Sequence, residues 1–148
     1  MKRQVFGNDS WLQAAAFYLR YQVFVLEQDI PPELEFDELD WRKPNYFVMF
    51  DETRPIATIR YQRDSKRADW IRPDRFCVAK AYRKQGIGRQ LLVAYEAKAQ
   101  KEGYLGSVLS AEASAQGFYE KLGYQPFGEP FYEDGILCIT MEKRFKAR

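Results

Sequence analysis

Between residues 75 and 103 the chain carries a strand signal, a basic loop with two glycines and a helix signal in direct succession. Phe76-Cys77-Val78 is a short apolar run, Gly86 and Gly88 lie in the loop, and apolar side chains recur every four residues from Ile87 to Ala99. Gly103 then follows the repeat, as a glycine commonly follows the last turn of a helix. A strand that runs through a tight loop into an amphipathic helix is typical of mixed α/β architectures.

The loop itself is a candidate phosphate site. Glycine lets the backbone approach a ligand closely, and the first turn of a helix presents N–H groups at the positive end of the helix dipole. Arg83, Lys84 and Arg89 add positive charge, so the loop suits a phosphate or pyrophosphate. It fits neither a dinucleotide fingerprint, which needs a glycine where Leu91 stands, nor a Walker loop. The glycine pair alone is equally consistent with a turn that precedes an ordinary helix.

The composition excludes several chemistries. The chain has 148 residues and no histidine, which rules out His-dependent triads, imidazole metal sites and a histidine base. Cys77 and Cys138 match no C-x-x-C spacing, so no zinc or thioredoxin-like site is expected. Both cysteines lie in apolar runs and are predicted to be free buried thiols, although two cysteines could also form one disulfide.

The apolar patterns predict one domain over residues 1–148, because the length suits a single core and no linker or repeat interrupts it. The expected elements are a strand at Val5, a helix from Asp9 or Ser10 to about Leu26, an antiparallel meander at 46–50, 56–61, 70 and 76–78, the helix from Ile87, a strand at 107–109, a helix at 113–122 and closing strands at 124–127 and 136–141. The fold class is therefore α/β (α+β), with a central mixed, mostly antiparallel sheet flanked by helices. Residues 74–109 are predicted to form a parallel, right-handed crossover.

Acidic and basic side chains gather in different segments. Five of the eight residues from Glu33 to Asp40 are acidic, whereas basic residues gather at Arg63–Arg75, at Lys80–Arg89 and at the C-terminus. An acidic end and a basic end would serve a cationic and an anionic substrate. Solvated loops explain the same charges equally well.

The chain shows no sign of a membrane or nucleic-acid partner. No apolar stretch reaches the roughly 20 residues of a membrane span, and no apolar run follows the basic Lys2-Arg3 as it would in a signal peptide. The net charge of +2 is too balanced to imply nucleic-acid binding. We therefore expect a cytoplasmic protein.

Three blocks of the sequence resemble the GNAT acyltransferases. Arg83-x-x-Gly86-x-Gly88 matches that family's (Gln/Arg)-x-x-Gly-x-(Gly/Ala) loop, and Phe118-Tyr119-Glu120-Lys121-Leu122-Gly123-Tyr124 matches its more specific second signature. Arg20-x-x-Val23-Phe24-Val25-x-Glu27-Gln28, followed by Glu35-x-Asp37-x-x-Asp40, is similar to the ElaA-like branch of small bacterial GNAT proteins. The resemblance covers nearly the whole chain and implies an N-acetyltransferase that uses acetyl-CoA.

The resemblance also implies where acetyl-CoA binds. The backbone N–H groups from Gln85 to Arg89 would hold the pyrophosphate, and Arg83 and Lys84 would supply charge at the mouth of the loop. Cys77 and Val78 would pair by their backbone with the pantetheine arm, and the N–H of Val78 would polarise the thioester carbonyl. The complete predicted cofactor-binding set is Cys77, Val78, Arg83, Lys84, Gln85, Gly86, Ile87, Gly88, Arg89, Glu112, Phe118 and Tyr119.

Three side chains are candidates for proton transfer. Tyr119 matches the family's usual general acid, which protonates the departing CoA thiolate, although a tyrosine at this position could equally pack beside Phe118. The attacking amine must lose a proton to a carboxylate or to water, because the chain has no histidine. Glu27 and Asp37 rank first among the carboxylates, which are Glu27, Glu33, Glu35, Asp37 and Glu112. A structural role is at least as good an interpretation for both, with Glu27 paired to Arg20 or Arg60 and Asp37 capping a turn.

Two positions depart from the resemblance. Cys138 stands where the ElaA-like branch carries a histidine in its closing strand, and Glu112 stands where many GNAT proteins have an asparagine that contacts CoA.

The predicted acceptor is a primary amine, either a small cationic amine or a peptide amine, and the acidic segment favours a cationic one. The alternative function is a non-catalytic acyl-CoA-binding sensor or regulatory module. The exposed edges of the closing strands could support a homodimer.

Overall fold

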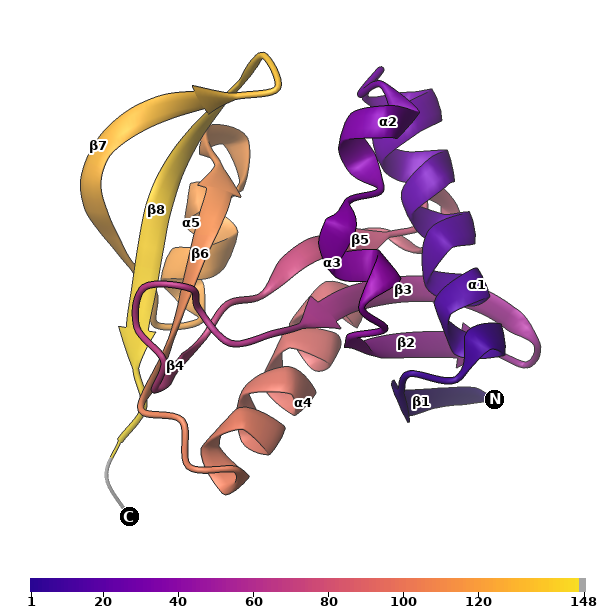
Figure 1. Cartoon of the computed structure of the whole chain (residues 1–148), viewed down its shortest axis with the longest axis horizontal. Helices are drawn as coiled ribbons and strands as arrows, with labels where there is room; N and C mark the ends of the chain where they lie inside the picture. Colours follow the sequence, from indigo (N-terminus) through magenta and orange to yellow (C-terminus); the bar gives the residue numbers. More distant parts are fainter. Residues whose placement is uncertain (147–148) are drawn as a thin grey trace. The chain divides into compact units, whose positions relative to one another are not determined.

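A computed structural model describes residues 1–146 as a mixed α/β fold with two four-stranded sheets flanked by helices (Figure 1). The first sheet has the strand order β1-β2-β3-β5 and the second the order β4-β6-β8-β7. The strands are β1 (Lys2–Gly7), β2 (Asn45–Asp51), β3 (Arg54–Tyr61), β4 (Trp70–Ile71), β5 (Asp74–Val78), β6 (Gly106–Glu112), β7 (Gln125–Glu133) and β8 (Ile136–Arg144). The helices are α1 (Ser10–Arg20), α2 (Pro32–Glu35), α3 (Glu38–Trp41), α4 (Ile87–Lys101) and α5 (Gln116–Lys121). The class predicted from the sequence is confirmed.

The chain forms two compact units. The first comprises residues 1–62 and 75–95, and the second comprises residues 63–74 and the chain from Glu96 onward. Each unit contains one of the two sheets, apart from the first residue of β5.

Both faces of the first sheet are covered within its unit, which explains why β2 and β3 are buried almost throughout. Successive side chains of a strand point to opposite faces. Tyr46 and Val48 therefore lie on one face, in a core with Leu12, Ala16 and Leu19 of α1. Phe47 lies on the other face, where its ring is 5.7 Å from that of Tyr95 on α4.

The N-terminal helix differs from the sequence expectation in its second half. Its start is as predicted, because Asp9 is the N-cap residue and its carbonyl accepts from the N–H groups of Leu12 and Gln13 at 3.0 Å. After Arg20, however, the chain continues as a π-helix over Tyr21–Glu27, denoted η1. A π-helical turn closes between residues five apart, and such turns are frequent at functional sites. Apolar spacing alone does not distinguish this wider turn from an α-helix.

The acidic segment folds into two short helices, α2 and α3, that were not predicted. Pro32 occupies the first position of α2, where its missing N–H is not needed. Asp37 caps α3, since its side chain accepts from the N–H of Asp40 while Asp40 accepts from the N–H of Asp37. This reciprocal capping box is the local reason for a turn of helix in so charged a stretch. The expectation that Asp37 could cap a turn is confirmed.

The predicted crossover over residues 74–109 is wrong in its strand pairing. β6 pairs in parallel with β4, through Trp70 opposite Gly106 and Ile71 opposite Ser107, and β5 belongs to the other sheet beside β3. Strand β4 therefore does not continue the antiparallel meander. Gly106 permits this pairing, because a Cβ at that position would lie 2.5 Å from the Trp70 ring. Neither feature is visible in the local apolar pattern.

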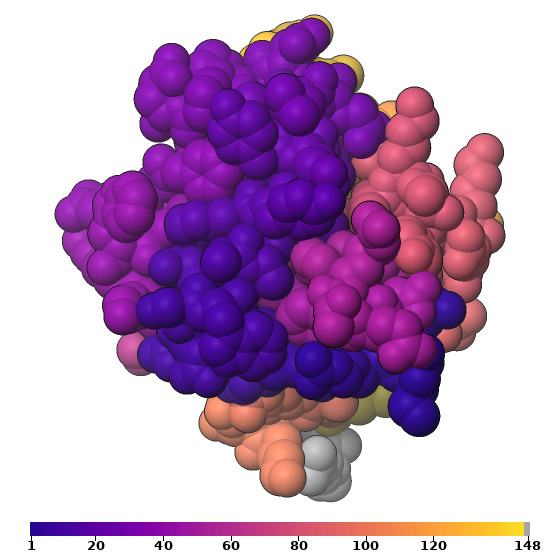
Figure 2. Space-filling model, turned by 90° about the vertical axis from the view of Figure 1, so that its right-hand side faces the viewer, coloured from indigo at the N-terminus to yellow at the C-terminus, as the bar shows by residue number. Residues whose placement is uncertain are grey.

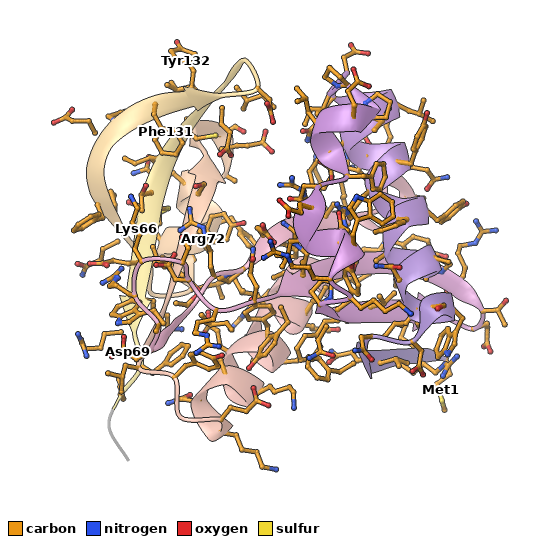
Figure 3. The ribbon with its side chains drawn as sticks, viewed as in Figure 1. Met1, Lys66, Asp69, Arg72, Phe131 and Tyr132 are labelled. Carbon is orange, nitrogen blue, oxygen red and sulfur yellow. The ribbon has the colours of Figure 1, made fainter. Side chains whose placement is uncertain are left out.

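The second sheet ends on β7, whose outer edge is exposed along most of its length. Tyr132 projects from this strand and is 74% exposed (Figure 3). Pro126 and Pro130 remove two backbone donors from β7, and the pairing with β8 is irregular between Phe127 and Phe131. Prolines and irregularities on an edge strand oppose the addition of another strand. The edge predicted for a dimer therefore carries features that hinder strand pairing.

No helix within residues 1–146 has the length and apolar character needed to cross a membrane.

Candidate active site

The loop between β5 and α4 has the backbone geometry of an anion-binding turn. After the single 3₁₀ turn at Lys80–Tyr82, Arg83 is extended, and Lys84 and Gly86 adopt positive φ angles of 64° and 78°. The N–H of Gln90 bonds to the carbonyl of Gly86 at 3.0 Å and opens the helical hydrogen-bond series. The three preceding N–H groups, those of Ile87, Gly88 and Arg89, therefore have no acceptor within the helix.

The surroundings of this loop fit a phosphate group. A Cβ built on Gly86 meets nothing within 4 Å, so the space beside its backbone is open. Lys84, Gln85 and Arg89 are exposed around it. The helical N–H groups can donate hydrogen bonds to a pyrophosphate, the two exposed cations can balance its charge, and the open space beside Gly86 leaves room for it.

Arg83, which was predicted to supply charge at the loop mouth, uses its guanidinium on protein groups instead. Its Nε donates to the carbonyl of Val78 at 2.9 Å, and its two terminal nitrogens donate to the two carboxylate oxygens of Glu27. Glu27 therefore pairs with Arg83 and not with Arg20 or Arg60. The hydrogen bonds from Arg83 lower the pKa of Glu27 below its usual value.

Three arginines form a network with three carboxylates of the acidic segment, and most of its members are buried: Arg20, Arg60, Glu35 and Asp40. Arg20 binds Asp40 through both terminal nitrogens at 2.8 Å, and its Nε donates to Glu35 at 2.8 Å. Arg60 donates to Asp40 at 3.1 Å, and Tyr46 donates to the same carboxylate at 2.9 Å. Helices α1, α2 and α3 form the indigo and purple face of this unit (Figure 2), and Arg20, Glu35 and Asp40, which belong to these helices, are buried.

The charges of this network compensate one another. Burial by itself would raise the pKa of Asp40, but the hydrogen bonds from Arg20 outweigh it and hold that pKa well below the usual range. For Glu35 the balance is reversed, and burial raises its pKa above the ordinary value despite three nearby arginines. Burial also raises the pKa of the Tyr46 phenol to about 12.

Asp37 is the third carboxylate of the network. Arg60 binds it through two nitrogens at 2.7 and 3.0 Å, and Arg75 donates to it at 3.1 Å. Burial opposes ionisation of Asp37, but the contacts with Arg60 and Arg75 prevail and lower its pKa. A carboxylate stabilised by two guanidinium groups is a weak proton acceptor, so these contacts argue against Asp37 as the base.

Arg75 is a residue that the sequence reasoning missed. It lies in β5 with a positive φ of 50°, and its Nε donates to the carbonyl of Glu35 at 3.0 Å. It thereby ties the predicted pantetheine strand to the acidic segment. The available signal was an arginine at the start of a strand together with an acidic block elsewhere in the chain, which does not specify the partner.

The acidic segment presents less free negative charge than its sequence suggests. Of its five acidic residues, Glu35, Asp37 and Asp40 are bound to arginines, and exposed Glu38 is paired with Arg42 at 3.0 Å. The segment thus acts chiefly as an internal partner of Arg20, Arg60 and Arg75. The segment therefore offers a cationic acceptor little free negative charge.

In the second unit, Tyr119 lies on α5 among aromatic rings. Its ring centroid is 5.1 Å from that of Phe118 and 5.7 Å from that of Tyr124. Its hydroxyl has no hydrogen-bond partner among residues 1–146, unlike Tyr124, which donates to Glu96 at 2.7 Å. Burial, and then the charge of Glu112, raise the pKa of Tyr119 well above its usual value. Its phenol is protonated at neutral pH, and the raised pKa makes it a weaker proton donor than an exposed tyrosine.

The remaining predicted residues lie near the ends of strands. Glu112 is the last residue of β6 and faces Cys138 in the register with β8. Cys138 and Cys77 are both free and buried, which confirms the sequence expectation. Burial raises the pKa of both thiols, so neither is a reactive thiolate at neutral pH. Within residues 1–146 no cluster of three or more histidine, cysteine or acidic side chains is placed to hold a metal ion.

Comparisons with known proteins agree with this arrangement. The family model of the acetyltransferase (GNAT) domain matches residues 15–145. The uncharacterized N-acetyltransferase YjcF of Bacillus subtilis (strain 168) is 34% identical over 144 residues, which cover 97% of this chain and 99% of that protein. A crystal structure described as an N-acetyltransferase from Lactobacillus plantarum is 36% identical, has a TM-score of 0.91 and covers 97% of each chain. Escherichia coli ElaA has a TM-score of 0.85 over 97% of this chain and 99% of its own, at 23% identity, and is similar in fold.

Strand β5, the glycine loop and helix α4 follow one another in the order that the sequence resemblance to the GNAT acyltransferases implied. The chain belongs to the GNAT acetyltransferase family, and the predicted enzyme class is confirmed. Membership of this family implies acetyl-CoA as the acetyl donor.

Proposed function

We propose that this protein transfers the acetyl group of acetyl-CoA to a primary amine by direct attack of the amine on the thioester. The observation that carries the proposal is the loop after β5, where the N–H groups of Ile87, Gly88 and Arg89 lack helical acceptors beside an open Gly86. These groups, with exposed Lys84, would hold the pyrophosphate of CoA. The end of β5 at Cys77 and Val78 would pair with the pantetheine arm.

In the proposed reaction, the amine nitrogen forms a bond to the thioester carbon while the carbon–sulfur bond breaks. The nitrogen loses one proton and the departing thiolate gains one, so that the products are an N-acetyl amine and CoA. Tyr119 would donate the proton to the thiolate; its place in the second family signature and a hydroxyl that bonds to no described residue support this role, whereas its raised pKa opposes it. Water is our preferred acceptor for the amine proton, because Glu27 and Asp37 are both engaged by arginine. The acceptor is a small or peptide primary amine, and we attach no preference for additional positive charge.

The proposal is tested by acetyl-CoA binding and by turnover. Calorimetry should show binding of acetyl-CoA, and thermal melts should show a Tm that rises with its concentration. Release of CoA thiol should then be measured across a panel of primary amines, small and peptide. Binding with turnover on at least one amine supports the proposal. Binding without turnover on any amine would favour the acyl-CoA sensor, and absence of binding would refute both.

A further inference from the structure

The Arg83 side chain joins the end of β5, five residues before it, to the end of η1, 56 residues before it. Its Nε–H donates to the Val78 carbonyl at 2.9 Å, and its terminal nitrogens hold both oxygens of Glu27, one of them at 2.8 Å. A two-point contact of this kind fixes the plane of the guanidinium as well as its position. The end of β5, the start of the glycine loop and the end of η1 are therefore held by one side chain.

Glu27 is itself held by an ordered element. It is the last residue of η1, whose Val23 lies in the hydrophobic core with α1. The carbonyl of Val23 accepts from the N–H of Gln28 at 3.1 Å, and that of Phe24 accepts from the N–H of Ile30 at 2.9 Å. The backbone on both sides of Glu27 is thus fixed by bonds that do not involve its side chain.

The peptide group between Val78 and Ala79 is held from two sides. Its carbonyl accepts from Arg83, and its N–H donates to the carbonyl of Ile56 at 2.8 Å. The hydrogen bond to Ile56 joins this peptide group to strand β3, whereas the hydrogen bond from Arg83 depends on how the guanidinium is oriented. Without Glu27, that guanidinium would be free to turn toward solvent or toward a bound anion.

We propose that Glu27 is a positioning residue for acetyl-CoA, which acts by holding Arg83 on the Val78 carbonyl at the end of β5. This inference rests on the proposed function in one respect, namely that acetyl-CoA is the ligand of the loop. It assigns Arg83 to the internal bracing of the loop and leaves the exposed Lys84 and Arg89 as its cations. It also gives Glu27 a role other than accepting the amine proton.

The contacts of Glu27 favour this role over that of a general base. Both of its oxygens accept from Arg83, so a proton taken up by Glu27 would displace a charge-assisted hydrogen bond. The side chains of Glu27 and Arg83 are 35% and 36% exposed. A pair so accessible to solvent contributes little to the stability of the fold, so its purpose is better sought in the geometry of the loop.

The inference is tested by the variants Glu27→Gln and Arg83→Lys and by the double variant. Each single variant should weaken acetyl-CoA binding by roughly tenfold in Kd, because a small displacement of a binding element has a large effect on affinity. The double variant should bind no more weakly than the weaker single variant, since both changes break one contact. In turnover assays at a series of pH values, the fall of kcat on the acidic side of its pH profile should be the same in Glu27→Gln as in the wild type.

The matched control is the exposed pair of Glu38 and Arg42, which has the same chemistry and does not touch the loop. Glu38→Gln should leave the Kd of acetyl-CoA and the Tm unchanged. Unchanged Kd in Glu27→Gln, or additive losses in the double variant, would overturn the inference. Loss of the acidic limb with unchanged Kd would identify Glu27 as the base. Because Kd is measured without turnover, the two proposals can be distinguished. An unchanged Kd in Glu27→Gln would overturn this inference even if the wild type acetylates an amine. A weakened Kd would support it even if the wild type binds acetyl-CoA without acetylating an amine.

Discussion

At the scale of single residues, the first unit contains charges that pair within the fold and charges that are exposed beside the glycine loop. Arg20, Arg60 and Arg75 are satisfied by carboxylates of the acidic segment, whereas Lys84 and Arg89 are exposed beside the glycine loop. The basic residues of the sequence are thus not interchangeable. Only those without an internal partner are available to an anionic ligand.

Asp40→Asn tests the buried network. The substitution leaves Arg20 and Arg60 without their shared partner in a buried site, so we expect the free energy of unfolding to fall by about 3–5 kcal/mol. Urea unfolding measures the effect. Glu38→Gln, in the exposed pair on the same helix, should change it by no more than about 0.5 kcal/mol. Equal effects of the two variants would contradict a structural role for the network.

Tyr119→Phe tests the general acid. Removal of a hydroxyl that bonds to no described residue should cost little stability, and kcat should fall by about 10²-fold or more because the thiolate would leave unprotonated. The Kd of acetyl-CoA should change little. Steady-state kinetics and calorimetry measure the two effects, with Tyr132→Phe on exposed β7 as the control. Wild-type activity in Tyr119→Phe would remove this residue from the mechanism.

At the scale of elements, the strand, loop and helix around residues 75–101 were the most predictable part of the molecule. Gly86, the apolar repeat from Ile87 and the loop charges all lie within one short segment, so their pattern is sufficient to predict the helix start. Strand β4 and helices α2 and α3 were harder, because each is only two to four residues long, which is too short for an apolar repeat to show. Trp70 finds its strand partner at Gly106 only in the folded chain.

Gly86→Ala tests the geometry of the loop. Gly86 has a φ of 78° in open space, so an added Cβ clashes with nothing but places alanine in a left-handed conformation that costs about 1–2 kcal/mol. We expect reduced stability or, if the loop shifts instead, weaker acetyl-CoA binding, measured by urea unfolding and calorimetry. Gly117→Ala is the matched control, since Gly117 also has open space but no positive φ and lies in α5. It should leave stability unchanged or increase it by up to about 1 kcal/mol. A Gly86→Ala protein identical to wild type in both measurements would contradict the described turn.

At the scale of the whole molecule, the buried carboxylates predict how stability depends on pH. Asp37 and Asp40 have pKa values lowered from 3.8, so their stabilisation is present above that value and is lost as the pH falls through their lowered pKa values. Glu35 has the opposite sign, because its pKa is raised from 4.5 and it takes up a proton more readily in the folded state. We therefore expect stability to hold down to about pH 4 and to fall steeply below it.

Urea unfolding at a series of pH values measures this dependence. In Asp40→Asn the loss of stability below about pH 4 should be shallower than in the wild type, because one of the carboxyl groups whose pKa is lowered by folding is absent. A wild-type protein that loses most of its stability between pH 7 and 5 would contradict the assignment, since no carboxylate with a lowered pKa titrates in that range.

The sequence by itself determined the family, the mixed α/β class and the place of the glycine loop, because each of these rests on patterns among residues that lie near one another in the chain. Tertiary structure alone decided the roles of the charges. Glu27 and Arg83 are 56 positions apart, and Arg75 and Glu35 are 40 apart, so no local pattern relates them. A carboxylate has the same formula whether it accepts a proton or holds a guanidinium. Which of the two it does depends on the side chains that folding places beside it.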